Sequence, residues 1–113
     1  MLTESRAQTT IRYATEPVVV ANACQRTLRL LGEVTHVSRE TGSIAGKLKL
    51  DWLTNSVLID LTITKKGDET ELSISTQRKE GALTSGGAQN GLQRFLHALA
   101  QDKELQGKSA SGW

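Results

Sequence analysis

The chain has little of the residue types that most often mark a specialised chemistry. Its 113 residues include one cysteine and one proline, and aromatic residues make up 4% of the total. A single cysteine excludes a disulfide within the chain. Cys24, His36 and His97 do not have the sequence spacing of metal ligands. We therefore expect no metal ion and no other cofactor.

Long apolar runs and a strong charge are also missing. No apolar stretch is long enough to span a bilayer, and the segment Met1–Arg6 lacks the basic start and apolar run of a signal peptide. We expect a cytoplasmic protein, although a secreted protein whose signal peptide has been removed would look the same. The net charge is +2, from 14 basic and 12 acidic residues that are interspersed. This charge is too small and too mixed to indicate nucleic-acid binding.

The length is that of one domain. A chain of this size buries roughly two-thirds of its unfolded surface, so it needs no disulfide or metal for stability. We expect the domain to cover residues 9–105. Residues 1–8 are polar and predict a disordered N-terminus, and the small, polar residues 106–113 predict a flexible tail.

The clearest pattern lies in residues 56–64. The odd-numbered residues from Val57 to Ile63 are apolar, whereas the even-numbered ones include Asp60 and two threonines. A period of two with β-branched residues is typical of a strand that buries one face. A strand buried on both faces would not carry Asp60, so the pattern favours an antiparallel sheet covered on one side.

Similar patterns predict the other elements. Glu16-Pro17 marks the start of the first helix and Gly32 its end, although the run Val18–Val20 would also suit an extension of the preceding strand. The last helix carries an apolar stripe at helical spacing. The expected strands are 10–15, 34–40, 43–50, 56–65 and 70–79, and the expected helices are 17–31 and 88–105. Packing both helices on one sheet face gives a two-layer α+β domain in β-α-β-β-β-β-α order.

Turn positions predict the strand registers. A two-residue loop at Gly67-Asp68 pairs Ile63 with Leu72 and Thr62 with Ser73. Placing Leu50 opposite Val57, and a turn at Thr41-Gly42, completes the sheet. These registers predict one row of side chains across the polar face, made of His36, Lys47, Asp60 and Ser75.

This row has two interpretations. It would form a polar binding platform, or an enzyme site built on His36, Lys47 and Asp60, with the histidine titrating near neutral pH. It would equally be a solvated face, which antiparallel sheets commonly have. We favour the solvated face, because the sequence contains no carboxylate pair, Ser-His-Asp order or dinucleotide fingerprint that would identify an enzyme.

The order of elements resembles the helix-grip and TATA-binding-protein-like folds. It is similar to small bacterial domains of unknown function, in which a helix ending in Leu-Gly precedes a meander of strands and a closing amphipathic helix. The matching segments are Leu30-Leu31-Gly32, Thr41-Gly42-Ser43-Ile44 and Arg94-Phe95-Leu96, within residues 10–102. The resemblance implies the two-layer fold. Members of the larger group hold apolar ligands between helix and sheet, bind DNA on the open sheet, or mediate assembly.

Two further places are candidates for binding. The layer between helices and sheet would hold an apolar ligand if the last helix does not close fully, with a pocket lined by Ile59, Leu61, Leu92, Phe95 and Leu99; a filled core is the default for proteins. Neighbouring apolar residues at Trp52-Leu53 would mark a contact surface or cover the end of the sheet. The glycines of residues 81–91 do not make a phosphate loop, because Gly87-Ala88 stands where that motif requires Lys and Ser or Thr.

These observations leave three functional hypotheses. The first is a non-enzymatic binding or assembly module that pairs with a second copy or another protein. The second is a carrier of a small apolar ligand or lipid. The third is nucleic-acid binding on the open face, where Asp60 would repel phosphate and aromatic residues for base stacking are lacking. The face would present Lys47, Lys49, Thr62, Ser73 and Gln77, with Arg78 as a further candidate.

Overall fold

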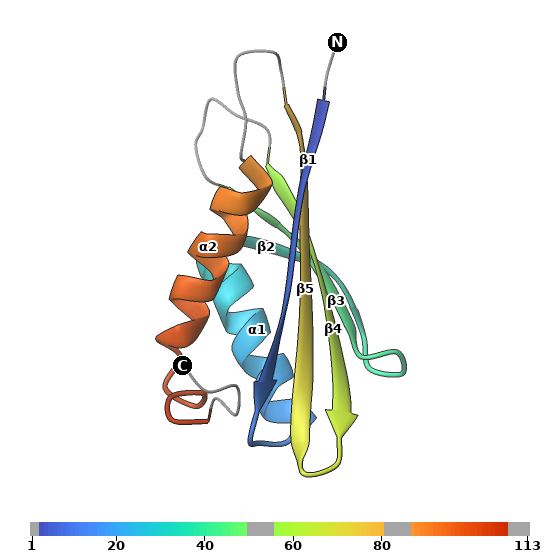
Figure 1. Ribbon diagram of the computed structural model, residues 1–113, viewed down its shortest axis with the longest axis vertical. Coiled ribbons are helices and arrows are strands. Elements are labelled where there is room, and N and C mark those ends of the chain that lie inside the picture. Colours follow the sequence, from blue (N-terminus) through green and yellow to red (C-terminus); the bar gives the residue numbers. More distant parts are fainter. Residues whose placement is uncertain (1–2, 50–55, 81–86, 109–113) are drawn as a thin grey trace.

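The computed structural model describes residues 3–49, 56–80 and 87–108. It confirms an α+β fold in β-α-β-β-β-β-α order, in which two helices cover one face of an antiparallel sheet (Figure 1). The five strands lie in the order β1-β5-β4-β3-β2. The elements are β1 (Thr3–Tyr13), α1 (Pro17–Leu31), β2 (Gly32–Ser38), β3 (Ser43–Leu48), β4 (Val57–Lys66), β5 (Glu69–Glu80) and α2 (Gly87–Ala100).

The core lies between this sheet and the two helices. The odd-numbered residues of β4 from Val57 to Leu61 and the even-numbered residues of β5 from Leu72 point into it, as the alternating pattern predicts. The apolar stripes of α1 and α2 face the same layer. Phe95, at the centre of α2, has no exposed surface.

The ends of α1 match the sequence signals. The helix begins at Pro17, so the valine run belongs to the helix and does not extend the preceding strand. It ends where the backbone N–H of Gly32 donates to the carbonyl oxygen of Leu28. A Cβ at Gly32 would collide with the carbonyl oxygen of Lys47, so the close approach of β3 requires glycine here.

The hairpin of β4 and β5 has the predicted register. Ile63 pairs with Leu72 and Thr62 with Ser73. Gly67 has a φ of 64° and no described non-glycine residue has a positive φ, as a two-residue turn with glycine first requires. The hairpin also places Asp60 opposite Ser75, as expected.

The predicted register of β3 against β4 is wrong by two residues. Val57 pairs with Leu48, not with Leu50, so Lys47 lies opposite Leu58 and Ala45 lies opposite Asp60. A shift of two residues leaves every side chain on its original face. The alternating pattern therefore cannot distinguish the two registers, and the connection that precedes Val57 is two residues longer than the expected pairing implied.

The predicted register of β2 is also wrong. Val37 pairs with Ile44, and His36 pairs with Ala45 instead of Lys47. The turn between the two strands spans residues 39–42, and Gly42 adopts a φ of 68°. The register shifts between Val34 and His36, which is a β-bulge and has no signature in the alternating pattern.

The first strand is longer than expected and the last helix is shorter. β1 begins at Thr3 and pairs with β5 along its whole length, so residues 3–8 belong to the sheet and are not a disordered N-terminus. Its inward positions at Ser5 and Thr9 are small and polar, which hides the strand from an apolar pattern. α2 ends at Ala100, and turns follow it up to Gly107. Of the expected flexible tail, residues 106–113, the structure describes residues 106–108, and residues 109–113 lie outside the described residues.

The packing of α2 on β4 gives a first test. Replacing Gly91 with alanine would place a Cβ 2.8 Å from Cγ1 of Val57. Alanine ordinarily stabilises a helix relative to glycine by about 1 kcal/mol, but overpacking costs typically 1–3 kcal/mol. We expect Gly91→Ala to lower the free energy of unfolding by about 1 kcal/mol, measured by urea denaturation.

The matched control is the same change in a Val57→Ala background. There the two closest contacts, with Cγ1 and Cγ2, are removed and only the contact with Cβ at 3.2 Å remains, so Gly91→Ala should cost less than in the wild-type background. A stabilising effect of Gly91→Ala in the wild-type background would contradict this packing.

Candidate functional site

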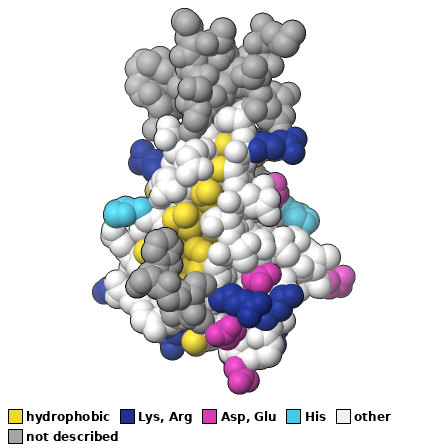
Figure 2. All heavy atoms as spheres, in the orientation of Figure 1, with side chains coloured by type: hydrophobic (Ala, Val, Ile, Leu, Met, Phe, Trp, Pro, Cys, Tyr) yellow, Lys and Arg dark blue, Asp and Glu magenta, His cyan; other side chains and the backbone are white. Residues whose placement is uncertain are grey.

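A groove with a volume of about 940 Å³ runs between α2 and β1. Figure 2 shows it as a stripe of apolar atoms along the molecule, at the place where Figure 1 shows these two elements. One wall is the edge strand β1 and the other is the exposed side of α2. The lining residues are Gln8, Thr9, Thr10, Ile11, Tyr13, Gln89, Leu92, Gln93, Leu96, His97, Leu99, Ala100, Leu105, Gln106 and Gly107.

The floor of the groove belongs to the core. Leu92, Leu99 and Leu105 line it and are each less than 5% exposed. Ile11 and Leu96 are only partly buried and form the apolar part of the walls. A ligand in the groove would therefore complete the burial of side chains that the protein itself leaves half covered.

The groove exists because α2 is fixed to the sheet near its start. The backbone N–H of Ala88 donates to Oγ of Ser5 on β1 (3.1 Å), and its carbonyl oxygen accepts a bond from Oγ1 of Thr76 on β5 (2.7 Å). Small residues at these positions let the helix approach the backbone of both strands. Beyond this contact the helix presents leucines towards β1, and the groove opens between them.

The rim of the groove is polar but carries no formal charge. None of its lining residues is Lys, Arg, Asp or Glu; the polar ones are glutamines, threonines, Tyr13 and His97. Burial raises the pKa of Tyr13 to about 12, with a smaller contribution from Cys24. The phenol therefore stays protonated at neutral pH and offers a hydrogen-bond donor.

One end of the groove is closed by the turns that follow α2. The backbone N–H of Ala14 donates to the carbonyl oxygen of Lys108, which ties this segment to the end of β1. Asp102 accepts bonds from Arg26 of α1, from Nε at 3.0 Å and from Nη2 at 2.9 Å. These contacts hold Leu105 in the floor of the groove.

A second, smaller hollow lies between the start of α1 and the hairpin of β2 and β3. Its volume is about 560 Å³, and it contains the exposed side chains of Val18 and Val37. Arg39, Glu40 and Lys65 also line it. Its smaller volume and charged rim make it less suited than the first groove to an apolar ligand.

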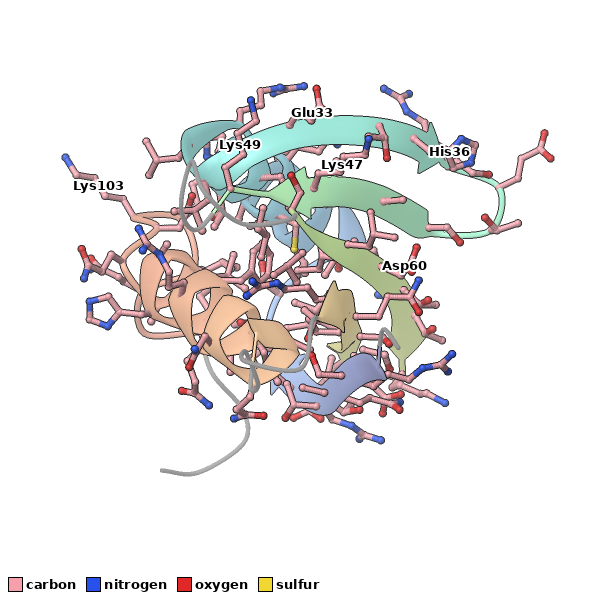
Figure 3. All side chains as sticks on the ribbon, turned by 90° about the horizontal axis from the view of Figure 1, so that it is seen from above. Glu33, His36, Lys47, Lys49, Asp60 and Lys103 are labelled. Carbon is pink, nitrogen blue, oxygen red and sulfur yellow. The ribbon has the colours of Figure 1, made fainter. Side chains whose placement is uncertain are left out.

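The expected polar row is only partly assembled. His36, Asp60 and Ser75 fall in one row, together with Ala45 and with Gln8 of β1, but Lys47 lies in the next row on the same face. Figure 3 shows His36, Lys47 and Asp60 apart from one another on the outer side of the sheet. No hydrogen bond or ion pair joins them in the described parts of the chain. The row therefore has the geometry of a solvated face.

The expected pocket residues lie in two different places. Ile59, Leu61 and Phe95 are at most 1% exposed and fill the centre of the core, whereas Leu92 and Leu99 also line the groove. The sequence reasoning missed Ile11, Tyr13 and Leu96 as wall residues. Ile11 and Tyr13 could have been found from the sequence, because they alternate with polar residues in the first expected strand. Trp52 and Leu53 lie outside the described residues.

Cys24 and Arg78 are both buried, which argues against a reactive thiol and against an arginine on the open face. Burial raises the pKa of the Cys24 thiol to about 12, with a smaller contribution from Asp102, so the thiol is inert at neutral pH. Arg78 does not lie on the open face, as the nucleic-acid hypothesis assumed; it is 9% exposed and belongs to the buried alternation of β5.

Within residues 3–49, 56–80 and 87–108, no group of three or more His, Cys, Asp or Glu side chains could hold a metal ion. No helix in these ranges is long and apolar enough to cross a membrane.

Comparison with known structures supports the fold. The crystal structure of Ara h 8.0201 superimposes with a TM-score of 0.69 at 6% identity, covering 86% of this chain and 93% of that chain. The solution structure of CalU16 from Micromonospora echinospora gives 0.56 at 14% identity, covering 99% and 78%. No protein-family model matches the chain, and no curated protein matches its sequence. At such low identity these likenesses show the fold alone, in agreement with the helix-grip arrangement.

The closed end of the groove gives a pH-dependent test. The hydrogen bond from Arg26 holds the pKa of Asp102 below its usual value of 3.8. A lowered carboxyl pKa stabilises the folded state fully above pH 3.8, and this stabilisation is lost as the pH falls through the folded-state value. We expect Asp102→Asn to cost about 1 kcal/mol of unfolding free energy at pH 7, with the cost shrinking towards pH 3.

Glu104→Gln is the control for this pair. Glu104 also lies 3.0 Å from Nη2 of Arg26, but its side chain is 55% exposed, so its loss should cost less than about 0.5 kcal/mol. Equal effects of the two substitutions, or a cost for Asp102→Asn that does not change with pH, would contradict the assignment.

Proposed function

We propose that this protein is a non-enzymatic binding module that holds a small, uncharged apolar molecule in the groove between α2 and β1. The observation that carries this proposal is the groove itself, which leaves Ile11 and Leu96 partly exposed above a floor of core leucines, between helix and sheet.

The size and composition of the groove support this ligand class. Small-molecule sites commonly have volumes of roughly 300–1,000 Å³, with mostly apolar walls and a few polar groups. The groove, at about 940 Å³, falls in this range. It would bury Ile11 and Leu96 further on binding, and this burial is the main source of affinity for an apolar ligand.

The absence of charge along the groove narrows the ligand further. An ionic ligand group would lose its hydration without gaining a counter-charge from any lining residue. The amides of Gln89 and Gln93 and the hydroxyl of Thr9, with the neutral phenol of Tyr13, suit a ligand that carries at most a hydroxyl or carbonyl group. The described side chains provide no joined set of nucleophile, base and orienting group that would add catalysis.

Fluorescence titration with the neutral probe N-phenyl-1-naphthylamine tests this proposal. Leu96→Glu would place a carboxylate in the wall of the groove, at a partly exposed position that the fold should tolerate. An apolar ligand would have to strip water from that carboxylate. We expect the affinity for the probe to fall at least about tenfold, or 1.4 kcal/mol.

The matched control is Leu30→Glu. Leu30 lies on α1, outside the groove, and is 78% exposed. This variant should bind the probe as the wild type does. If the wild type does not bind the probe, or if both variants lose affinity equally, the groove is not the site.

A second candidate, self-association, is favoured by the edge position of β1. This strand has 11 residues and pairs with β5 on one side only. A long unpaired edge is a template for a further strand, and natural proteins usually block such edges. Antiparallel pairing of two copies of β1 centred on Gln8 would set Arg6 of each copy opposite Thr10 of the other and would leave no like charges opposed at these positions.

Sedimentation velocity over a range of concentrations tests self-association. We expect a dimer for the wild type and a monomer for Gln8→Lys, because two lysines would face each other across the two-fold axis. Asp60→Lys, on the open face away from the edge, is the control and should leave the dimer intact. A wild type that stays monomeric at every concentration rules out this second candidate and leaves the groove proposal unaffected.

A further inference from the structure

Arg78 is the only charged residue among the buried residues of the described chain. It is 9% exposed, and its Nε atom is buried without a hydrogen-bond partner in the described structure. Its position continues the inward alternation of Leu72, Ile74 and Thr76 along β5. A guanidinium group in this position has lost much of its hydration, which is costly unless an anion compensates it.

The start of α2 is attached to the residues that surround Arg78 on the sheet. Ser5, which pairs with Arg78 across β1 and β5, accepts a hydrogen bond from the N–H of Ala88. Thr76, two residues before Arg78 on the same face, donates to the carbonyl oxygen of Ala88. On the other side, Gly91 packs against Val57. The first two turns of α2 are therefore held against β1, β5 and β4 beside Arg78.

Two positive groups therefore occur at this end of the sheet: the guanidinium of Arg78 and the N-terminus of α2. The N-terminus of a helix carries roughly half a positive charge, and its first N–H groups have no acceptor within the helix. In α2 the N–H of Ala88 is taken by Ser5, so the backbone amides offered to a ligand are those of Gln89 and Asn90. Gly87–Ala100 is long enough to have such a dipole, and no acidic residue lies in its first turn. No described carboxylate forms an ion pair with Arg78. Two positive groups in one poorly hydrated place create a demand for a negative charge.

We propose that Arg78 and the first turn of α2 form a binding site for an oxyanion, meaning a carboxylate or phosphate group. A guanidinium donates in a planar fork that matches such groups, and helix N-termini bind them through backbone N–H groups. The site is separate from the apolar groove, because Arg78 does not line the groove and the contacts of Ala88 with Ser5 and Thr76 lie between them. The two sites can therefore be tested independently.

NMR on the unaltered protein tests the site directly. We would follow the Nε–H signal of Arg78 and the backbone amide of Gln89 during titrations with sodium phosphate and with sodium acetate, at constant ionic strength set by sodium chloride. Both signals should shift and saturate together during the titration with at least one of the two anions. The anion that saturates them at the lower concentration would identify phosphate or carboxylate as the preferred group. Unchanged signals with both anions would overturn the proposal.

Thermal unfolding of variants gives a second readout. In chloride alone, Arg78→Met should raise the unfolding midpoint, because it removes a buried charge that lacks a partner. A saturating anion should raise the wild-type midpoint by about 4 °C or more and leave that of Arg78→Met unchanged. Arg94→Met, at an exposed position of α2, is the control and should respond to the anion as the wild type does. Equal anion responses of Arg78→Met and the wild type would contradict the site.

Discussion

The attachment of α2 to the sheet through Ala88 is the contact on which the rest of the structure depends. Both backbone groups of this residue are used, the N–H by Ser5 of β1 and the carbonyl oxygen by Thr76 of β5. The contact satisfies an N–H group that the helix itself cannot pair, and it places Phe95 over the centre of the sheet. Because the helix is held at this end, its path across the sheet is determined by the leucines that follow.

Two different environments result on the two sides of this contact. Towards the C-terminal end of α2, the helix and β1 enclose an apolar groove whose rim has no formal charge. Towards the start of the helix, Arg78 is buried beside the residues that hold Ala88. The same backbone contact thus separates the uncharged groove from the proposed anion site. The closing turns, fixed by Arg26 and Asp102, complete the groove at its far end.

The type and order of the helices and strands could be predicted from the sequence because the patterns that determine them are local. The alternation from Val57 to Ile63, the turn at Gly67 and the stripe around Phe95 each depend on neighbours within a few residues. The registers of β2 and β3 could not be predicted in the same way. A two-residue shift keeps every side chain on its face, and a bulge near Thr35 changes the pairing without changing the composition.

The candidate sites were harder to predict than the fold, and for a related reason. The groove depends on where α2 and β1 stop touching, which no pattern within either segment encodes. Its best sequence signal is the small, polar inward face of β1 at Ser5 and Thr9, which fills little space beneath a helix. Arg78 could have been assigned to the core by continuing the alternation of β5 from Leu72 through Thr76, as the structure shows.

The central claim is that the groove between α2 and β1 is the place where an apolar molecule binds. Methyl NMR of protein labelled at its Ile, Leu and Val methyl groups, titrated with N-phenyl-1-naphthylamine, tests it most directly. We expect nuclear Overhauser contacts between the probe and the methyl groups of Ile11, Leu92 and Leu96. Contacts confined to Val18 and Val37, or to Leu58 on the open face, would place binding elsewhere and contradict the claim.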